Sequence, residues 1–528
     1  MTRWNTAPLN RHQAVLYSPT IDDSIAGHHP VRLFDEVLDS FNFDDWEMEY
    51  DRHSGQPPIH PRVLAGCILY GLSLGLRSSR RLEDACINRI DFMWLMDGRT
   101  PDHSTICHFR LKFEKPLKAL FRRVGRVAME MGMVTLNQVT LDGTDIRANN
   151  SRFNTAKRPS LEQKLAVLDQ QIDQAMTEAK RQDQSDDQLL GSESSPARLP
   201  AALKDLQRRQ KQLKAALARV AQMEKERERR SDRESSPSKA PAVPLADCDS
   251  RVLPNKTGGC APNYTVVLAT DSHSGIILDS QVLGGNDEAS TVMPAIANIR
   301  ESFGAKPRQL LADSGFNTGE NLSGLKEQDV QPLMPPRQPV DASAALRDDP
   351  GQPVAEENRA ALPVNPQSKR LDRAAFIYDE QTDQYHCPMG KTLSFAEKKK
   401  YDHHGKKGVY RIYQCAQCAG CPLAALCLAK KTAQRRICRD EHENDREEMA
   451  RHLASEEGTK QYRRRAHIAE TPHAAIKTKM NFRQFLLRGQ AKVEQEWCWA
   501  TTAYNLMKVT ARKALDRARQ TLSTPLPA

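Results

Sequence analysis

Short apolar runs with strand character, separated by helical patterns, constrain the fold of this chain more than any other feature. Strand patterns lie at about 134–142, 263–271, 275–283, 308–315 and 330–335. Helical patterns at about 288–303 and 319–328 separate the last three strand patterns. Three consecutive strands followed by an alternation of helix and strand predict an α/β fold built on a mixed sheet flanked by helices.

Two aspartates lie where two of these strand patterns end. Asp142 closes the strand pattern of VTLDGT, and Asp313 closes that of QLLADSGF. Open α/β sheets place their chemistry at the carboxyl ends of strands. In a ribonuclease-H-like sheet the first strand is central and the strand before Asp313 lies beside it, so the two carboxylates would meet. Glu470, in the basic helical stretch YRRRAHIAETPHAAIK, is the candidate for a third carboxylate.

Carboxylates grouped in this way can hold a pair of divalent cations. Two Mg²⁺ ions about 3.5–4 Å apart can activate a water and stabilise the leaving oxygen of a phosphodiester. Mg²⁺ takes oxygen ligands, so Asp and Glu are suitable, with Mn²⁺ as the alternative ion. We expect Asp142 and Asp313 to share one ion, and Asp142 and Glu470 to hold the other. Asp145 competes with Asp142, and Glu494 and Glu496 are fallback candidates for Glu470.

Four stretches, in a fixed order, carry a family resemblance. They are VTLDGTDIRANNSRFNT, LLADSGFNTGENL, VQPLMPPR and YRRRAHIAETPHAAIKTKMNFRQFLLRGQAKVEQEW. With them the chain resembles the DDE-type transposases of bacterial insertion sequences, from near residue 30 to about residue 510. The resemblance implies a ribonuclease-H-like catalytic domain, catalytic roles for Asp142, Asp313 and Glu470, and double-stranded DNA as partner, both inverted-repeat ends and target. It also implies a homodimer in the synaptic complex, because two ends must be joined.

The family carries a Tyr, Arg, Glu, Lys signature around its glutamate. This chain approximates the signature with Tyr462, Arg465, Glu470 and Lys477. The spacing between Arg465 and Glu470 is one residue longer than usual, which leaves Arg463 as an alternative. Residues seven apart share a helix face, so Arg463, Glu470 and Lys477 would line one stripe. We expect Tyr462, Arg463, Arg465, Lys477 and Arg488 to contact DNA.

Pro472 complicates the helix that carries this signature. It must either kink that helix or begin a new one behind a Thr471 cap. The shared face of Arg463, Glu470 and Lys477 therefore depends on a kinked but continuous helix.

The region before the first strand has helical periodicity. We predict a flexible terminus over 1–30 and a helical DNA-binding domain over 31–133. The arginines of this domain that can contact phosphates are Arg77, Arg80, Arg81 and Arg110. A solvated basic face is the ordinary alternative for such residues.

Heptads interrupt the catalytic domain directly after its first strand. The seam consists of Leu161, Leu165, Leu168, Ile172, Leu199, Leu203, Leu206, Leu213, Leu217 and Val220, with Gln210 as its one polar member. A Ser-rich break at about 181–197 predicts an antiparallel helical hairpin, inserted with its return linker over 159–245. The hairpin is either a solubilised arm without function or an arm for dimerisation or DNA clamping, and the sequence does not choose.

A cysteine-rich segment over 373–440 predicts a small zinc module. Cys387, Cys418, Cys421 and Cys427 form the set that best resembles the family's cysteine-rich insertion, and four thiolates suit a structural Zn²⁺. Substitutes within this set are Cys415, His403 and His404. The alternative is a reduced, metal-free loop.

The remaining boundaries follow from composition and periodicity. The catalytic core occupies 134–158 and 246–336, and a Pro-rich linker over 337–372 is expected to be disordered. The C-terminal helical part of the core spans 441–520, including a long helix at about 489–518. A disordered tail is expected over 521–528.

Bulk properties fit a DNA-binding protein but do not establish one. The chain has 528 residues, a formal net charge of +10 and a pI near 9.0, which suit a polyanionic partner. No apolar run reaches the roughly 18 residues of a membrane span, and the first residues lack a secretory signal, so we expect a cytoplasmic protein. The leading function is a transposase. The alternatives are a non-catalytic DNA-binding protein derived from one and a nuclease without strand transfer.

Overall fold

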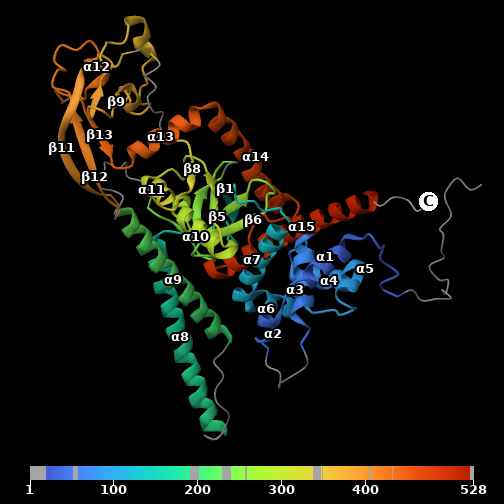
Figure 1. Ribbon diagram of the computed structural model, residues 1–528. Coiled ribbons are helices and arrows are strands. Elements are labelled where there is room, and N and C mark those ends of the chain that lie inside the picture. The colour runs from blue at the N-terminus through green and yellow to red at the C-terminus, as the bar shows by residue number, and fades with distance from the viewer. Residues whose placement is uncertain are drawn as a thin grey trace, which may run out of the picture. The chain divides into compact units, whose positions relative to one another are not determined.

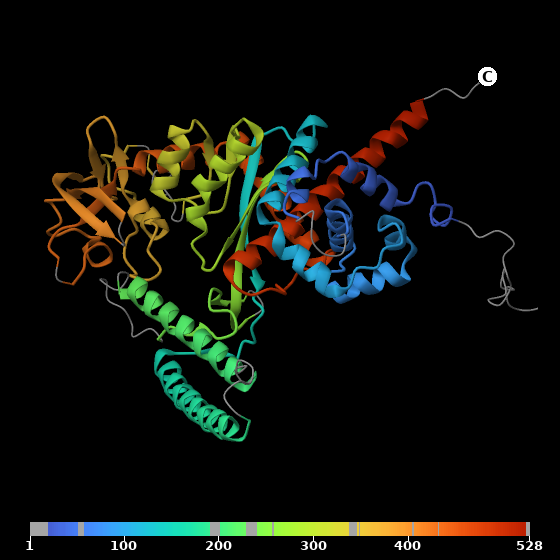
Figure 2. The same ribbon diagram turned by 90° about the horizontal axis from the view of Figure 1, so that it is seen from below.

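A computed structural model describes residues 20–50, 58–190, 201–228, 240–255, 258–336, 346–347, 349–403, 406–430 and 432–523. The chain divides into two compact units, whose elements are labelled in Figures 1 and 2. The first unit consists of Met1–Met133, His473–Arg483 and Glu494–Ala528, and the second of Val134–Pro472 and Gln484–Val493. Within the described residues, no helix combines the length and apolar character that crossing a membrane requires.

The first unit is helical throughout its described residues. Its helices are α1 (Pro30–Asp39), α2 (Asp44–Glu47), α3 (Pro61–Ser73), α4 (Ser79–Asn88), α5 (Ile90–Leu95), α6 (His103–Lys112), α7 (Glu114–Glu130) and most of α15 (Gln490–Ser523). Helix α3 is apolar all round and is buried from Val63 to Leu72, as a core helix should be. The predicted flexible terminus lies outside the described residues up to residue 19.

Helix α15 differs from the prediction that residues 441–520 all belong to the catalytic core. Its Glu496 forms an ion pair with Arg77 at 2.8 Å, and the indole of Trp499 donates to the carbonyl of Arg110 at 3.2 Å. Trp499 also packs edge-on against Trp46. The buried aromatic face of α15 therefore completes the core of the first unit.

These contacts also correct the expectation for two arginines. Arg77 is 9% exposed and stacks on Phe482 as well as pairing with Glu496, and Arg110 donates to the carbonyl of Arg77 at 2.7 Å. Arg77 and Arg110 therefore make contacts inside the unit instead of facing a DNA phosphate, whereas Arg80 and Arg81 are exposed.

A mixed sheet with β1 at its centre forms the second unit. Its strands are β1 (Gln138–Arg147), β4 (Arg251–Pro254), β5 (Cys260–Asp271), β6 (Ile277–Leu283), β7 (Gln309–Leu311) and β8 (Gln331–Leu333). The order is β4-β5-β1-β7-β8, with β6 also paired to β5. Strand β5 pairs antiparallel with β1, β4 and β6, and β7 and β8 run parallel to β1. The α/β fold with a mixed sheet is confirmed.

Strand β1 is longer at its carboxyl end than the sequence pattern predicted. It pairs with β5 along its length, from Val139 opposite Asp271 to Arg147 opposite Asn263. Asp142 therefore lies in the middle of a strand rather than at its end. This part is completed by helices α10 (Val292–Phe303), α11 (Gly319–Glu327) and α13 (Glu443–Ala454), and by α14 (Glu456–Thr478) as far as Pro472. The 3₁₀ turn η1 (Glu288–Thr291) precedes α10.

The predicted helical hairpin follows β1. Helices α8 (Arg158–Leu190) and α9 (Ala201–Glu228) pack along each other through their described seam residues. Both helices are labelled in Figure 1. The polar seam residue Gln210 donates to Asp169 at 2.6 Å. Strands β2 (Thr155–Ala156) and β3 (Val243–Pro244) pair at the root. Helix α8 continues into the predicted break as far as Leu190, and residues 191–200 and 229–239 lie outside the described part.

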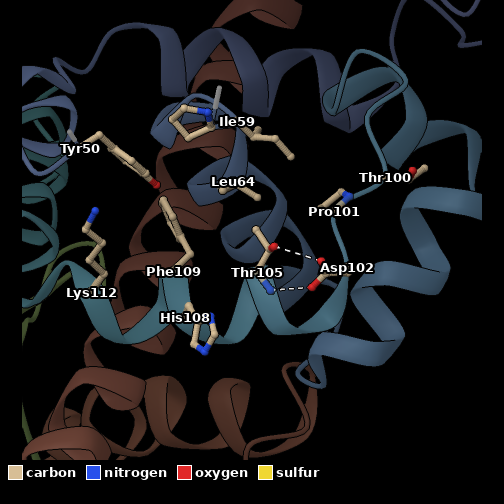
Figure 3. A pocket seen from close by; sticks show the side chains of 11 residues that line it. Tyr50, Ile59, Leu64, Thr100, Pro101, Asp102, Thr105, His108, Phe109 and Lys112 are labelled. Atoms are coloured by element: carbon tan, nitrogen blue, oxygen red, sulfur yellow. Dashed lines mark hydrogen bonds between the residues drawn. The ribbon is translucent and has the colours of Figure 1, made fainter. Parts of the chain in front are cut away.

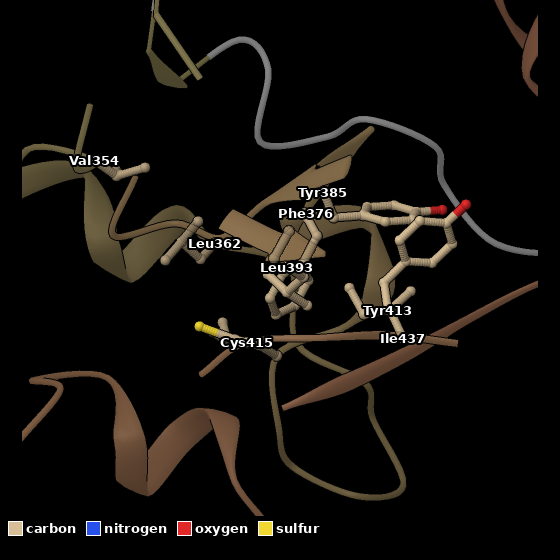
Figure 4. Close-up of a cluster of buried hydrophobic side chains, with 10 residues drawn as sticks. Val354, Leu362, Phe376, Tyr385, Leu393, Tyr413, Cys415 and Ile437 are labelled. Atoms are coloured by element: carbon tan, nitrogen blue, oxygen red, sulfur yellow. The ribbon is translucent and has the colours of Figure 1, made fainter. Parts of the chain in front are cut away.

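The cysteine-rich segment forms a second, five-stranded sheet of order β13-β12-β11-β10-β9. Its elements are β9 (Ile377–Asp379), β10 (Gln384–His386), β11 (Thr392–His403), β12 (Lys406–Gln414), α12 (Ala424–Cys427) and β13 (Arg436–Asp440), preceded by η3 (Glu356–Ala361) and η4 (Arg373–Ala375). Its apolar cluster, drawn in Figure 4, includes Val354, Leu362 and Leu371. The structure thus differs from the predicted disorder over 349–372, because these three side chains are buried. Residues 337–345, 348 and 524–528, also predicted to be disordered, are not described.

Candidate active site

Pairing of β1 with β7 brings two carboxylates to one guanidinium. The parallel register matches Thr140 to Leu311, so Asp142 and Asp313 each follow two residues later. The guanidinium of Arg465 donates to Asp142 Oδ1 at 2.7 Å and lies 3.8 Å from Asp313 Oδ2. The side chains of Arg465 and Asp142 are 15% and 19% exposed, and that of Asp313 is 45% exposed. The site is therefore open to solvent on the side of Asp313.

A turn fixes the carboxylate of Asp313. Strand β7 ends at Leu311, and Asp313 Oδ1 accepts a hydrogen bond from the amide of Gly315 at 2.7 Å. A Cβ on Gly315 would lie 2.8 Å from the same oxygen, so a larger residue at this position would displace the carboxylate. The DSG sequence after the strand therefore holds the carboxylate close to the backbone.

Helix α14 contributes Tyr462 together with Arg465. The Tyr462 hydroxyl donates to the carbonyl of Ala312 at 3.5 Å, one residue before Asp313. Burial raises the pKa of Tyr462, although the nearby Arg465 opposes this shift, so its hydroxyl keeps its proton at neutral pH. Arg463, the alternative to Arg465, is exposed. The structure thus places Arg465, rather than Arg463, on the carboxylates.

Glu470 does not lie with the two aspartates. Helix α14 continues through Pro472, so Glu470 follows Arg465 by five residues and points about 140° away around the helix. Glu470 is exposed, and Ala469 is the buried residue at this level. Throughout the described ranges, no group of three or more His, Cys, Asp or Glu side chains is arranged to hold a metal ion. The third carboxylate is therefore absent from the arrangement seen.

The competing acidic residues have other partners. Asp145 accepts a hydrogen bond from Thr265 at 3.0 Å, and strand alternation directs it to the face opposite Asp142. Glu496 pairs with Arg77, and it belongs to the first unit with Glu494. Of the remaining expected DNA contacts, Lys477 is half-buried near the end of α14. Arg488 is exposed, and its Nε donates to the carbonyl of Asn149 at 2.9 Å.

Sequence reasoning missed the carboxylate of Glu288, which lies against Gly143, the residue after Asp142. A Cβ on Gly143 would lie 2.5 Å from the carboxyl carbon of Glu288, so this carboxylate rests on the glycine backbone. Alternation along β1 puts Glu288 against the face opposite the Asp142 side chain. Gly143 was the sequence signal that could have revealed this contact, because a glycine inside a strand often marks a place where another group approaches the backbone closely.

The four expected zinc ligands cluster without binding geometry. Burial and the neighbouring thiols of Cys418, Cys387 and Cys421 raise the pKa of Cys427 to about 11, while Arg435 opposes them. The amide of Cys421 donates to the carbonyl of Cys418 at 3.3 Å, as in a tight turn. Of the substitutes, Cys415 is buried in the core of Figure 4. The side chain of His403, and all of His404, lie outside the described part.

The first unit has a separate pocket, drawn in Figure 3. Its volume is about 450 Å³, and its walls include Tyr50, His108 and Lys112. At one end Asp102 caps α6 by accepting from the amide of Thr105 at 2.8 Å. Hydrogen bonds from Ser104 and Thr105 lower the pKa of Asp102 to about 2. Its one carboxylate is therefore committed to the cap.

Two family models match the chain. Residues 386–510 match a family described as "Transposase DDE domain", and residues 19–112 match one described as "Transposase domain (DUF772)". No curated protein matches the chain significantly. The two matches confirm the resemblance to the DDE-type transposases of insertion sequences. The first matched range includes Arg465, Glu470 and the cysteines from Cys387 to Cys427, whereas Asp142 and Asp313 lie outside both ranges.

Proposed function

We propose that this transposase binds the inverted-repeat ends of an insertion sequence and then cleaves and joins DNA strands. Asp142 and Asp313 would share a divalent cation, Mg²⁺ or Mn²⁺. This proposal rests on the observation that both carboxylates lie beside the guanidinium of Arg465. The sheet supports a ribonuclease-H-like core, since the antiparallel β6 and β5 lead to a central β1, and the parallel β7 and β8 follow. The match to transposase domains at both ends of the chain supports DNA as substrate.

The donor atoms of this site suit a hard cation. Carboxylate oxygens are the ligands that Mg²⁺ prefers, and one of the two carboxylates is open to solvent. A bound divalent cation would activate a water and offset charge on the phosphate that is cleaved. Arg465 neutralises the carboxylates in the arrangement seen, and its planar guanidinium is suited to hold a DNA phosphate when it is displaced.

We further propose that Glu470 completes the site by a movement of α14. Pro472 removes one backbone hydrogen bond from this helix, which gives the helix a weak point two residues after Glu470. A local rotation there would turn the exposed Glu470 toward the sheet. Tyr462, Arg463, Arg465, Lys477 and Arg488 are proposed as DNA contacts, and a homodimer would hold two ends together.

The cysteine-rich module is proposed to hold a structural zinc ion. Cys387, Cys418, Cys421 and Cys427 supply four soft donors, which is the set that structural zinc sites use. The packing of Cys387, Cys418 and Cys427 against one apolar cluster supports a shared site. Because all four positions would be occupied by thiolates, the ion would stabilise this module and take no part in cleavage.

An assay with end-labelled DNA tests the proposed function. The probe is a duplex carrying the DNA that flanks the coding region, incubated with the full chain and Mg²⁺. Cleavage followed by joining to a second duplex is the expected result. Binding without cleavage would favour a non-catalytic DNA-binding protein, and cleavage without joining would favour a nuclease, so either outcome would overturn the proposal. The same assay in Mn²⁺ is expected to give the same products.

A further inference from the structure

A cleft at the root of the helical hairpin combines three positive charges with no acidic side chain. The cleft has a volume of about 380 Å³, and all its lining residues belong to the second unit. The cations are Lys164 from α8, Arg209 from α9 and Arg488 from the segment before α15. Asn154, Gln171 and Gln212 add side-chain amides, and none of the described lining residues is Asp or Glu. This composition suits an anionic ligand that accepts several hydrogen bonds.

The floor of this cleft is held rigidly. The amide of Leu245 donates to the carbonyl of Asn154 at 3.0 Å, and the amide of Ala246 donates to Asn150 at 2.8 Å. Arg488 is fixed by its two hydrogen bonds to Asn149, at 2.9 and 3.3 Å. A preformed site of this kind loses little conformational entropy on binding.

Two ion pairs fix the root of the hairpin, one between its two helices and one to the sheet. Arg158 at the start of α8 pairs with Glu224 near the end of α9, and Arg251 on β4 pairs with Glu226 at 2.8 Å. Two of the acidic residues near the end of α9 are therefore used to anchor the hairpin. In contrast, Lys164 and Arg209 are exposed, and the described residues offer neither of them an ion pair.

Two acidic residues close to the lining residues in sequence have hydrogen-bond partners outside the lining. Asp169 on α8 accepts from Gln210 within the seam. Asp247 is 2% exposed and accepts from the Tyr264 hydroxyl at 2.7 Å and from the amide of Gly489 at 3.0 Å. Asp247 also interacts electrostatically with Arg488, so the positive charge presented to solvent is carried mainly by the exposed Lys164 and Arg209.

Beside the cleft stands an exposed aromatic residue. Phe153 precedes the lining residue Asn154 and is 80% exposed, and the guanidinium of Arg152 lies 4.6 Å from its ring centroid. Exposed aromatics next to cations are typical of surfaces on which nucleic-acid bases stack. A small anion or a polyphosphate has no base that could stack on the Phe153 ring. The exposed ring therefore favours a nucleic acid as the ligand.

Strand β1 connects this surface to the proposed active site. Five residues separate Asp142 from Arg147, the last residue of β1, which corresponds to about 17 Å along a strand. The segment with Asn149, Phe153 and Asn154 follows immediately. A segment of a few residues therefore joins the strand that carries Asp142 to the lining of the cleft.

We infer that this cleft binds the DNA backbone, with Lys164, Arg209 and Arg488 on phosphates and Phe153 against a base. The inference rests on the proposed function, because it assigns a place for the DNA that the transposase would cleave. It assigns the helical hairpin a role in DNA binding.

The test is a salt titration of DNA affinity with the full chain and a short duplex of arbitrary sequence. Each phosphate contact contributes about one unit to the slope of log affinity against log salt. Lys164→Gln with Arg209→Gln is expected to lower this slope by about two, while Lys164→Arg with Arg209→Lys keeps it. Phe153→Ala is expected to weaken binding about tenfold without changing the slope, since it removes stacking but no charge.

A matched control separates the cleft from net charge. Lys180→Gln with Arg181→Gln removes the same charge from α8, about 24 Å farther along the helix than Lys164, and is expected to leave the slope unchanged. An equal fall in the control, or no fall in the cleft variant, would overturn the inference. If the wild-type chain neither binds nor cleaves DNA, the proposed function fails. If it does both while the cleft variant keeps the wild-type slope, only the inference fails.

Discussion

The sheet and helix α14 position their proposed catalytic carboxylates by different means. Asp142 and Asp313 meet because β1 and β7 are hydrogen-bonded neighbours, so the backbone register brings both carboxylates to Arg465. Glu470 depends on helical phase, and one extra residue after Arg465 turns a side chain by about 100°. In a site shared between a sheet and a helix, the strand register therefore fixes the positions of the carboxylates on strands. The position of a carboxylate on the helix changes with the rotation of that helix.

The largest expected effect concerns the strand side. Asp313→Asn should lower the cleavage rate about a thousandfold, because lost stabilisation of transition-state charge costs this much. DNA binding should be retained, since the side chain of Asp313 is partly exposed and its turn can persist. Asp145→Asn, on the opposite face of β1, should cleave within a few-fold of wild type. Wild-type cleavage by the Asp313→Asn protein would rule out a ligand role.

On the helix side, Glu470→Gln should lower cleavage about a hundredfold if α14 turns toward the sheet. Glu457→Gln is the matched control on the same helix, because its carboxylate is exposed and bonds only Gln461 among the contacts described. Steady-state cleavage rates of the two variants decide the matter. Equal rates would show that the site is completed without Glu470.

A third prediction concerns the cysteine-rich module, which we expect to bind its metal independently of the strand-borne and helix-borne carboxylates. About one zinc ion per chain should be present in the native protein, and Cys421→Ser with Cys427→Ser should remove it and unfold the module. Cys438→Ser changes an exposed thiol on β13 and should retain the metal. Elemental analysis with limited proteolysis provides the measurement. Native protein without zinc would refute this prediction.

Arg465→Ala should expose the repulsion between the paired aspartates. Without Mg²⁺, removing this part-buried partner should lower the free energy of unfolding by about 1–3 kcal/mol. Mg²⁺ should then stabilise the variant more than the wild type, since no guanidinium competes for the carboxylates. Thermal melts of both proteins with and without Mg²⁺ test this. An equal response to Mg²⁺ would contradict the competition.

The smallest effect is expected in the first unit, away from either carboxylate region. The pKa of Asp102 is lowered to about 2 from 3.8, so its contribution to stability is present above about pH 4 and is lost as pH falls toward 2. Asp102→Asn keeps a capping oxygen but has no proton to bind, so unfolding of the first unit should depend less on pH in this window. Melting curves between pH 2 and 5 would show identical slopes if the carboxylate contributes nothing.

Much of the sheet could be predicted because its strands carry local apolar patterns. The patterns near 263–271, 275–283, 308–315 and 330–335 coincide with β5, β6, β7 and β8 within a few residues. The extension of β1 to Arg147 was missed because Thr144 and Asp145 are polar, and only pairing with β5 reveals it. The assignment of α15 to the first unit was also missed, because it depends on the tertiary contacts of Trp499 and Glu496.

The parts of the site that lie on strands could be predicted from the sequence, whereas the parts on helix α14 could not. Asp142 and Asp313 could be placed together from the order of strands with the support of the family resemblance. The choice between Arg463 and Arg465 could not, since it depends on the rotation of α14 against the sheet. Order in residues 349–372 also escaped prediction, because three buried side chains in a Pro-rich stretch carry no periodicity.

Crystals grown with Mn²⁺ would test the pairing of the two aspartates most directly, through the anomalous signal of the ion. We predict a Mn²⁺ ion bound by oxygens of both Asp142 and Asp313, at about 2.0–2.6 Å, with Arg465 moved away from them. A fully occupied ion elsewhere, with Arg465 still bonded to Asp142 and no signal between the carboxylates, would contradict the account.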